Sequence, residues 1–149
     1  MKKVFHFDSP TEKYHADACV VSCFDARFEL ATRKFLKKRG VRWADPLKIA
    51  GGAKAFASPA EDSARSFAVS QVQTSMRLHG THRVILMVHS DCGAYGGLQT
   101  FDHNEEHEAV HHERELRAAA EFLQSNIPSI EIECYDLKFD GVWAVEAVE

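Results

Sequence analysis

The stretch Val20-Val21-Ser22-Cys23-Phe24-Asp25-Ala26-Arg27 decides how this chain is organised. It begins as an apolar run typical of a buried strand, and it ends with a thiol, a carboxylate and a guanidinium at alternate positions. Alternate side chains of an extended segment point the same way, so Cys23, Asp25 and Arg27 can share one face where the strand runs into a loop. The stretch thus predicts a reactive site at the carboxyl end of a strand.

A second apolar run, Val84-Ile85-Leu86-Met87-Val88, ends in His89-Ser90-Asp91-Cys92-Gly93. Parallel α/β sheets bind their ligands beyond the carboxyl ends of the strands. His89 and Cys92 stand on one turn and can reach the same ion, and Cys23 offers a third ligand from a neighbouring strand. Two thiolates and one imidazole suit tetrahedral Zn²⁺ and leave a fourth position for water or substrate.

The alternative is that both cysteines are buried core thiols and His89 is a hydrogen-bonded loop residue. A His-x-x-Cys spacing alone would not decide between them. The charges of Asp25 and Arg27 beside Cys23 favour the metal site, because charged groups at a strand end need a partner.

Composition narrows the class of protein. The chain has 149 residues, 45% of them hydrophobic and 27% charged, which suits one soluble globular domain. A formal net charge of −4 favours neither nucleic acid nor an anionic membrane as a partner. No apolar run is long enough to span a membrane, and the first eight residues do not resemble a signal peptide. Four cysteines are too few for a disulfide scaffold, so we expect a reducing, cytoplasmic location.

Hydrophobic periodicity predicts a single α/β domain over residues 1–149: a mainly parallel sheet flanked by helices, with an antiparallel edge strand at the C-terminus. We expect residues 1–17 to form an irregular N-terminal arm. Ser58, Pro59 and Glu61 predict a capping box for the second helix. The predicted strands cover residues 18–23, 46–50, 83–88, 130–135 and 142–145, and the predicted helices cover residues 28–39, 58–80 and about 105–125.

Two motifs together, Cys23-x-Asp25-x-Arg27 and His89-x-x-Cys92-Gly93, resemble the zinc signature of the β-class carbonic anhydrases. The similarity extends over residues 18–135 and includes the segment 45–52, which resembles one ending in Arg-Asn-Ala-Gly in the family. The resemblance implies Zn²⁺ held by Cys23, His89 and Cys92, and reversible hydration of CO₂ to bicarbonate by zinc-bound hydroxide. It also implies a homodimer or a higher oligomer.

The resemblance gives Asp25 and Arg27 catalytic roles. The carboxylate would orient the hydroxide, or ligate zinc in an inactive state. We also expect Gly51, Gly52 and Gly93 to lie beside the substrate. The chain departs from the family at Lys48-Ile49, which replaces an Arg-Asn pair, and at Val88, where many members have glycine. Asp91 adds a carboxylate beside the site, although smaller members of the family often have a similar Ser/Thr-Asp-Cys-Gly stretch.

Two alternative functions stay open. The same zinc chemistry would serve hydrolysis of CS₂ or COS. A chain in which Asp25 permanently fills the fourth zinc position would instead be a non-catalytic binding module. The presence of both Asp25 and Arg27 favours catalysis.

Several other residues have two interpretations. His103, His107 and His111 have helical spacing and suit a second metal site or proton transfer, but Glu105, Glu106, Glu108 and Glu113 around them favour a solvated helix face. We expect His112 and Cys134 to be packing residues, and Cys19 to lie too far from Cys23 to share its ion. Phe24 and Tyr95 either line an apolar substrate pocket or simply pack.

Overall fold

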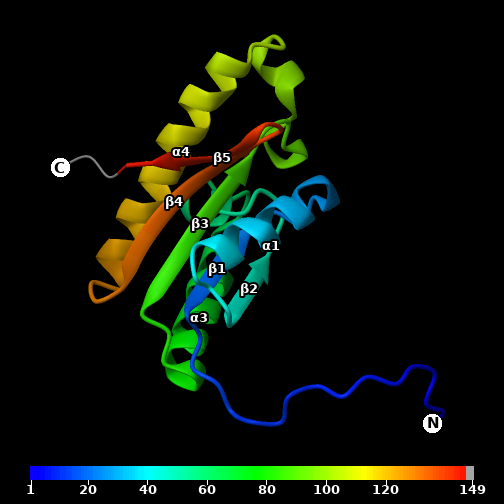
Figure 1. Cartoon of the computed structure of the whole chain (residues 1–149). Helices are drawn as coiled ribbons and strands as arrows, with labels where there is room; N and C mark the ends of the chain where they lie inside the picture. The colour runs from blue at the N-terminus through cyan, green and yellow to red at the C-terminus, as the bar shows by residue number, and fades with distance from the viewer. Residues whose placement is uncertain (147–149) are drawn as a thin grey trace.

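Five strands form one sheet in the order β2-β1-β3-β4-β5 in the computed structural model, which describes residues 1–146 (Figure 1). Strands β1 to β4 run parallel, and β5 pairs antiparallel with β4. The predicted α/β sheet with an antiparallel edge strand is therefore confirmed. The strands are β1 (Ala18–Ser22), β2 (Ala44–Lys48), β3 (Arg83–His89), β4 (Glu131–Lys138) and β5 (Gly141–Val145).

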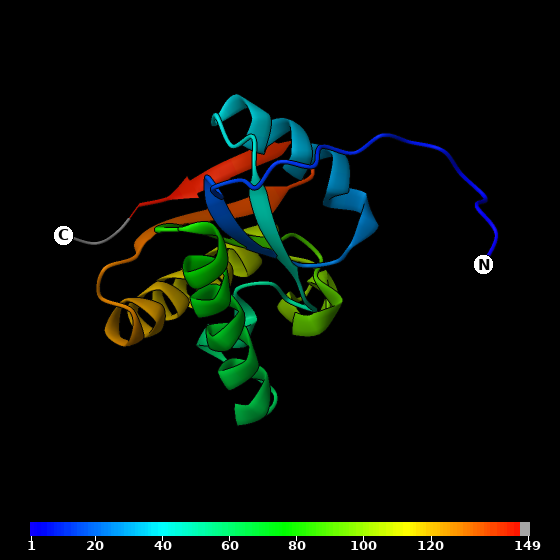
Figure 2. The same cartoon turned by 90° about the horizontal axis from the view of Figure 1, so that it is seen from below.

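Helices cover both faces of this sheet. Figure 2 shows α1 on one face and α3 and α4 on the other. The α-helices are α1 (Glu29–Lys38), α2 (Lys54–Ala57), α3 (Asp62–His79) and α4 (Glu105–Asn126). Three short 3₁₀ turns complete the elements: η1 (Ala26–Phe28), η2 (Gly93–Tyr95) and η3 (Leu98–Phe101).

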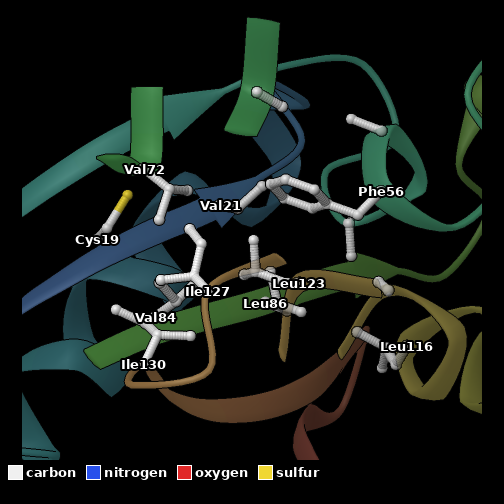
Figure 3. Packing of buried hydrophobic residues seen from close by; sticks show 14 of the residues in the cluster. Cys19, Val21, Phe56, Val72, Val84, Leu86, Leu116, Leu123, Ile127 and Ile130 are labelled. Carbon is white, nitrogen blue, oxygen red and sulfur yellow. The ribbon is translucent and has the colours of Figure 1, made fainter. Parts of the chain in front are cut away.

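The central strands supply two hydrophobic cores. Every residue of β1 is buried, which explains why its sequence has no polar alternation. Val21 and Leu86 face α2, α3 and α4, where they pack near Phe56 and Leu123 (Figure 3). Their neighbours in the sequence face α1 and form the second core with Phe28. This double burial holds β1 and β3 rigidly in the middle of the sheet.

Two predicted elements differ from the structure. Strand β2 begins and ends two residues earlier than predicted. The capping box is wrong: Ser58 ends the short helix α2, and its hydroxyl donates to Glu115 on α4 rather than to the start of α3. Glu61 is the residue before α3, and its side chain makes no capping hydrogen bond. Helix α2 was not predicted, because a four-residue helix is too short to show periodicity.

The strand order places a topological switch point at β1. From β1 the chain passes through α1 to β2 on one side, and β3 pairs with the other side of β1. The carboxyl ends of β1 and β3 are therefore adjacent, which is where open α/β sheets bind ligands. Cys23 follows β1 directly and His89 ends β3.

The first 17 residues form no helix or strand, and their N-terminal part extends away from the sheet (Figures 1 and 2). Their last residues pack on the domain: Ala16 is buried, and its backbone N–H donates to the carbonyl of His79. Within the described part of the chain, no helix combines the length and the apolarity needed to cross a membrane.

Candidate metal centre

Cys23, His89 and Cys92 lie together at the switch point. One ligand atom from each of the three side chains lies within 4.8 Å of the others. Cys23 is half-buried, whereas His89 and Cys92 are each only 1% exposed. In residues 1–146, this is the one group of three or more such side chains close enough to hold a metal ion.

The imidazole of His89 leaves one nitrogen free for a metal. Its Nδ1 donates to the carbonyl of Ser90 at 2.8 Å, so in the neutral ring Nε2 carries the lone pair. Nε2 is buried and has no hydrogen-bond partner, and the Phe28 ring packs against the imidazole with centroids 4.6 Å apart. Buried polar atoms are normally satisfied, and a metal ion between Nε2 and the two sulfurs would satisfy this one.

The two thiols share a negative charge. The adjacent Cys92 thiol lowers the pKa of the Cys23 thiol to about 3, against the opposing effect of burial. His89 and the backbone N–H of Gly51 also favour the Cys23 thiolate. The pKa of Cys92 is correspondingly raised, because ionising it would place a second charge beside Cys23. A dication relieves this conflict by binding both sulfurs as thiolates, so the donor set fits Zn²⁺.

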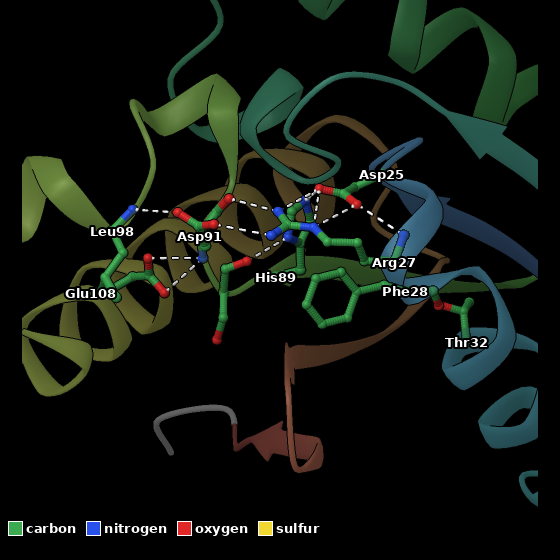
Figure 4. A network of polar contacts seen from close by, with 9 residues as sticks. Asp25, Arg27, Phe28, Thr32, His89, Asp91, Leu98 and Glu108 are labelled. Atoms are coloured by element: carbon green, nitrogen blue, oxygen red, sulfur yellow. Dashed lines mark hydrogen bonds and ion pairs between the residues drawn. The ribbon is translucent and has the colours of Figure 1, made fainter. Parts of the chain in front are cut away.

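Asp25 and Arg27 form an ion pair beside this group. Arg27 Nη2 donates to Asp25 Oδ2 at 2.8 Å, and Arg27 Nε lies 3.1 Å from Oδ1 (Figure 4). These hydrogen bonds lower the pKa of Asp25 to about 2, so the carboxylate is ionised at neutral pH. Oδ2 lies 3.9 Å from His89 Nε2, which places the carboxylate next to the free ring nitrogen.

Asp91 binds the opposite side of the guanidinium. Its Oδ2 accepts from Arg27 Nη1 at 3.0 Å, and its backbone carbonyl accepts from Nη2 at 3.1 Å. Lys48, at the position where the family has arginine, does not contact this ion pair, because its ammonium pairs with Glu29 at 2.6 Å. The Arg27 side chain is therefore held between two carboxylates, those of Asp25 and Asp91.

The family comparison agrees with this geometry. A family model described as "Putative carbonic anhydrase" matches residues 13–149. This chain belongs to the β-class carbonic anhydrase family. No curated protein sequence matches the chain.

Solved carbonic anhydrase structures share the fold. The β-carbonic anhydrase isoform I of Trichomonas vaginalis has a TM-score of 0.62 and 14% identity, over 94% of this chain and 87% of that one. Tetrameric β-carbonic anhydrases from Sordaria macrospora give a TM-score of 0.60 at 11% identity, covering 89% and 81%. A carbon disulfide hydrolase matches with a TM-score of 0.56 at 14% identity, covering 91% and 81%.

The three glycines expected beside the substrate occupy different places in this carbonic anhydrase family member. Gly51 lies by the Cys23 sulfur. Gly52 has φ +55°, and a Cβ there would meet the Met87 carbonyl oxygen, so it permits close packing of backbone behind the site. Gly93 has open space around it and lines the cavity in front of the site.

That cavity has a volume of about 760 Å³ and opens over Asp25 and Arg27. Its apolar wall comes from Leu98 and Phe139, neither of which sequence analysis singled out. Phe24 is 66% exposed instead of enclosed. The Tyr95 hydroxyl donates to Glu115, which draws its ring toward α4. The remaining lining residues are Asp91, Gly93, Gly96, Gly97, Gln99 and His103.

The histidines of α4 and of the segment before it do not gather at one site. His103 lines the mouth of the cavity, His107 is exposed, and His111 packs against Tyr95 and Phe101. Their ring nitrogens form no metal-binding group with other described side chains. His112 is fully buried, as expected of a packing residue, but the expected hydrogen bond is not made: neither ring nitrogen has a hydrogen-bond partner among the described residues, and Nδ1 lies 3.4 Å from Asp136 Oδ1.

The prediction of a solvated helix face is wrong at Glu108. It is only 3% exposed and accepts from the backbone N–H of Asp91. Glu108, His112 and Leu116 stand four residues apart, so they share one helix face, and this spacing could have indicated that Glu108 is buried. The charged residues around Glu108 obscured it.

Proposed function

We propose that this protein catalyses the reversible hydration of CO₂ to bicarbonate and a proton, using Zn²⁺ held by Cys23, His89 and Cys92. The observation that carries the proposal is the buried, unpartnered Nε2 of His89 between two thiols and the Asp25–Arg27 ion pair. Zinc in this position supplies a Lewis acid that lowers the pKa of a bound water to about 7.

Asp25 orients the attacking water. A carboxylate whose pKa is about 2 stays ionised, so it accepts a hydrogen bond from the water and does not deliver a proton itself. Arg27 positions Asp25 through both carboxylate oxygens, which restricts the carboxylate to one orientation. The pair thus fixes the direction from which water attacks the carbon of CO₂.

The cavity supplies the binding surface for CO₂. Leu98 and Phe139 offer apolar contacts suited to an uncharged, linear molecule, and Gly93 leaves room beside the site. We propose that Gly93 contacts the substrate, and that Gly51 and Gly52 contribute through backbone atoms at the base of the site.

Hydrolysis of CS₂ or COS is the second candidate, and the likeness to a carbon disulfide hydrolase supports it. Both substrates are small heterocumulenes that the same water could attack. The non-catalytic alternative, with Asp25 as a fourth zinc ligand, has less support because Arg27 binds both oxygens of Asp25.

We further propose that the protein is a cytoplasmic homo-oligomer that binds neither nucleic acid nor membrane. The structural similarity to tetrameric β-carbonic anhydrases supports an oligomer. Phe24 and Phe139 are each about two-thirds exposed near the site, and a second copy would cover them. The four free thiols suit a reducing compartment, and a net charge of −4 argues against nucleic acid.

Stopped-flow CO₂ hydration on zinc-quantified protein tests the proposal. We expect hydration by the wild type and a loss of at least about tenfold in Arg27→Ala with zinc retained, because Asp25 then loses the group that orients it. Arg33→Ala removes an exposed arginine of α1 and should keep the wild-type rate. Fully zinc-loaded wild type that hydrates no CO₂ at any pH would overturn the assignment, and CS₂ and COS assays on the same samples would then decide the substrate.

A further inference from the structure

We propose that Asp91 and Glu108 are positioning residues that keep Arg27 bound to Asp25, and thereby keep Asp25 off the metal. This inference rests on the proposed metal centre. It concerns two carboxylates that are not among the proposed metal ligands, and it explains why the site holds several acidic groups around one arginine.

All three acceptor atoms of Asp91 are used. Oδ2 and the backbone carbonyl bind the Arg27 guanidinium at 3.0 and 3.1 Å. Oδ1 accepts from the backbone N–H of Leu98 at 2.9 Å, which fixes the carboxylate plane (Figure 4). The side chain of Asp91 is therefore locked from the protein side while it holds the arginine.

Glu108 in turn fixes the backbone of Asp91. Asp91 has φ +55°, a left-handed conformation that residues other than glycine adopt rarely. Both carboxylate oxygens of Glu108 lie 3.0 Å from the N–H of Asp91. Glu108 has no other hydrogen-bond donor among the described residues, so an almost completely buried carboxylate serves this one N–H.

Arg27 needs this support because it is poorly enclosed. Its side chain is 47% exposed, and on the side away from Asp25 the guanidinium is bound by Asp91. Without Asp91 the guanidinium would lose two hydrogen bonds, and only its ion pair with Asp25 and the rings of Phe28 and Phe139 would resist its turning into solvent. Asp25 would then be an unpaired carboxylate 3.9 Å from a proposed metal-ligating nitrogen, where a dication attracts it strongly. Occupation of the metal by Asp25 would exclude water and anions from the fourth position.

Azide binding to the Co²⁺-substituted protein tests this, read from the visible absorption of the metal. We expect Asp91→Asn and Glu108→Leu, which removes the acceptor for the Asp91 N–H, to bind Co²⁺ fully but to bind azide at least about tenfold more weakly than the wild type. Simple electrostatics predicts the opposite sign, because each substitution removes a negative charge and should favour an anion. Glu106→Gln, an exposed carboxylate of the same helix, is the matched control and should leave azide affinity at the wild-type value.

A variant that lacks Asp25 distinguishes the loss of Arg27 positioning from a general disruption of the site. If Asp25 blocks the metal in Asp91→Asn, the double variant Asp25→Ala/Asp91→Asn should bind azide at least as tightly as the wild type. The inference is overturned if Asp91→Asn and Glu108→Leu bind azide as well as the wild type does, or if removing Asp25 restores nothing. Wild type that takes up no Co²⁺ overturns the metal centre and this inference together. Wild type that binds Co²⁺ and azide but hydrates no CO₂ overturns the proposed function alone.

Discussion

At the residue scale, hydrogen bonds fix the polar side chains of the site, and one buried atom, Nε2 of His89, is left without a partner. His89 uses Nδ1 for a backbone carbonyl and keeps Nε2 free, while Asp25 gives both oxygens to Arg27. Side chains fixed in this way need little rearrangement when a metal or substrate binds, which is what preorganisation requires. The side chains fixed most firmly are therefore those to which we assign chemical roles.

The proposed zinc ligands give a direct test at this scale. We expect Cys92→Ser to lose most of the about one zinc per chain, because a neutral hydroxyl is a poor substitute for a thiolate. Metal content measured by mass spectrometry on reduced, freshly purified protein would show it. Cys134→Ser, which changes a free thiol on β4 outside the site, should keep its zinc. Equal zinc in the two variants would contradict the ligand assignment.

Single residues were predictable where the motif carried the information. Cys23, Asp25, Arg27, His89 and Cys92 stand at spacings that the sequence displays. The partners of Asp91 were not predictable, because they depend on how the first turn of α4 meets the loop after β3. Sequence spacing gives the distance between residues along one element, and it says little about contacts between two elements.

At the element scale, Asp45 joins three segments at the end of the sheet away from the metal centre. Its carboxylate accepts from Ser75 and Tyr14 at 2.6 Å each and pairs with His79 at 2.7 Å. Strand β2, helix α3 and the root of the N-terminal arm thus meet at one side chain. Burial opposes its charge, but these hydrogen bonds outweigh burial and lower the pKa of Asp45.

Stability should therefore depend on Asp45 and on pH. We expect Asp45→Asn to lower the free energy of unfolding at pH 7 by about 1–3 kcal/mol, the usual contribution of hydrogen bonds to a charged group. Because the folded pKa of Asp45 lies below the unfolded value of about 3.9, the stabilisation is present above that pH and lost as pH falls through the folded pKa. Urea denaturation of both proteins across this range measures it. A difference that stays constant down to pH 2 would contradict this linkage.

The elements themselves were largely predictable from periodicity. Helix α4 and strand β3 were placed within one residue at each end, because both show sustained patterns of buried positions. The start of α3 was not, because Ser58-Pro59 imitates a helix start while its hydroxyl serves a contact with α4. A local signal for a cap cannot reveal that a distant residue uses the same atom.

At the scale of the whole molecule, the proposed homo-oligomer predicts the mass of the protein in solution. Light scattering at micromolar concentration should give at least twice the 16.8 kDa mass of one chain, because apolar side chains near the site and in the N-terminal arm are exposed. Val4, Phe5 and Phe7 are each more than 70% exposed. A mass equal to one chain would contradict the proposed oligomer while leaving the metal centre untested by that measurement.

The position of the proposed ligands on β1 and β3 also bears on how the protein is made. These strands are neighbours in the sheet, yet one strand and three α-helices lie between them in the chain. Contacts of such long range form slowly, because a large loop must close first. During synthesis Cys23 leaves the ribosome well before the other two proposed ligands, His89 and Cys92. An ion that needs all three can bind only after β3 has paired with β1, so metal loading would report that these two strands have paired.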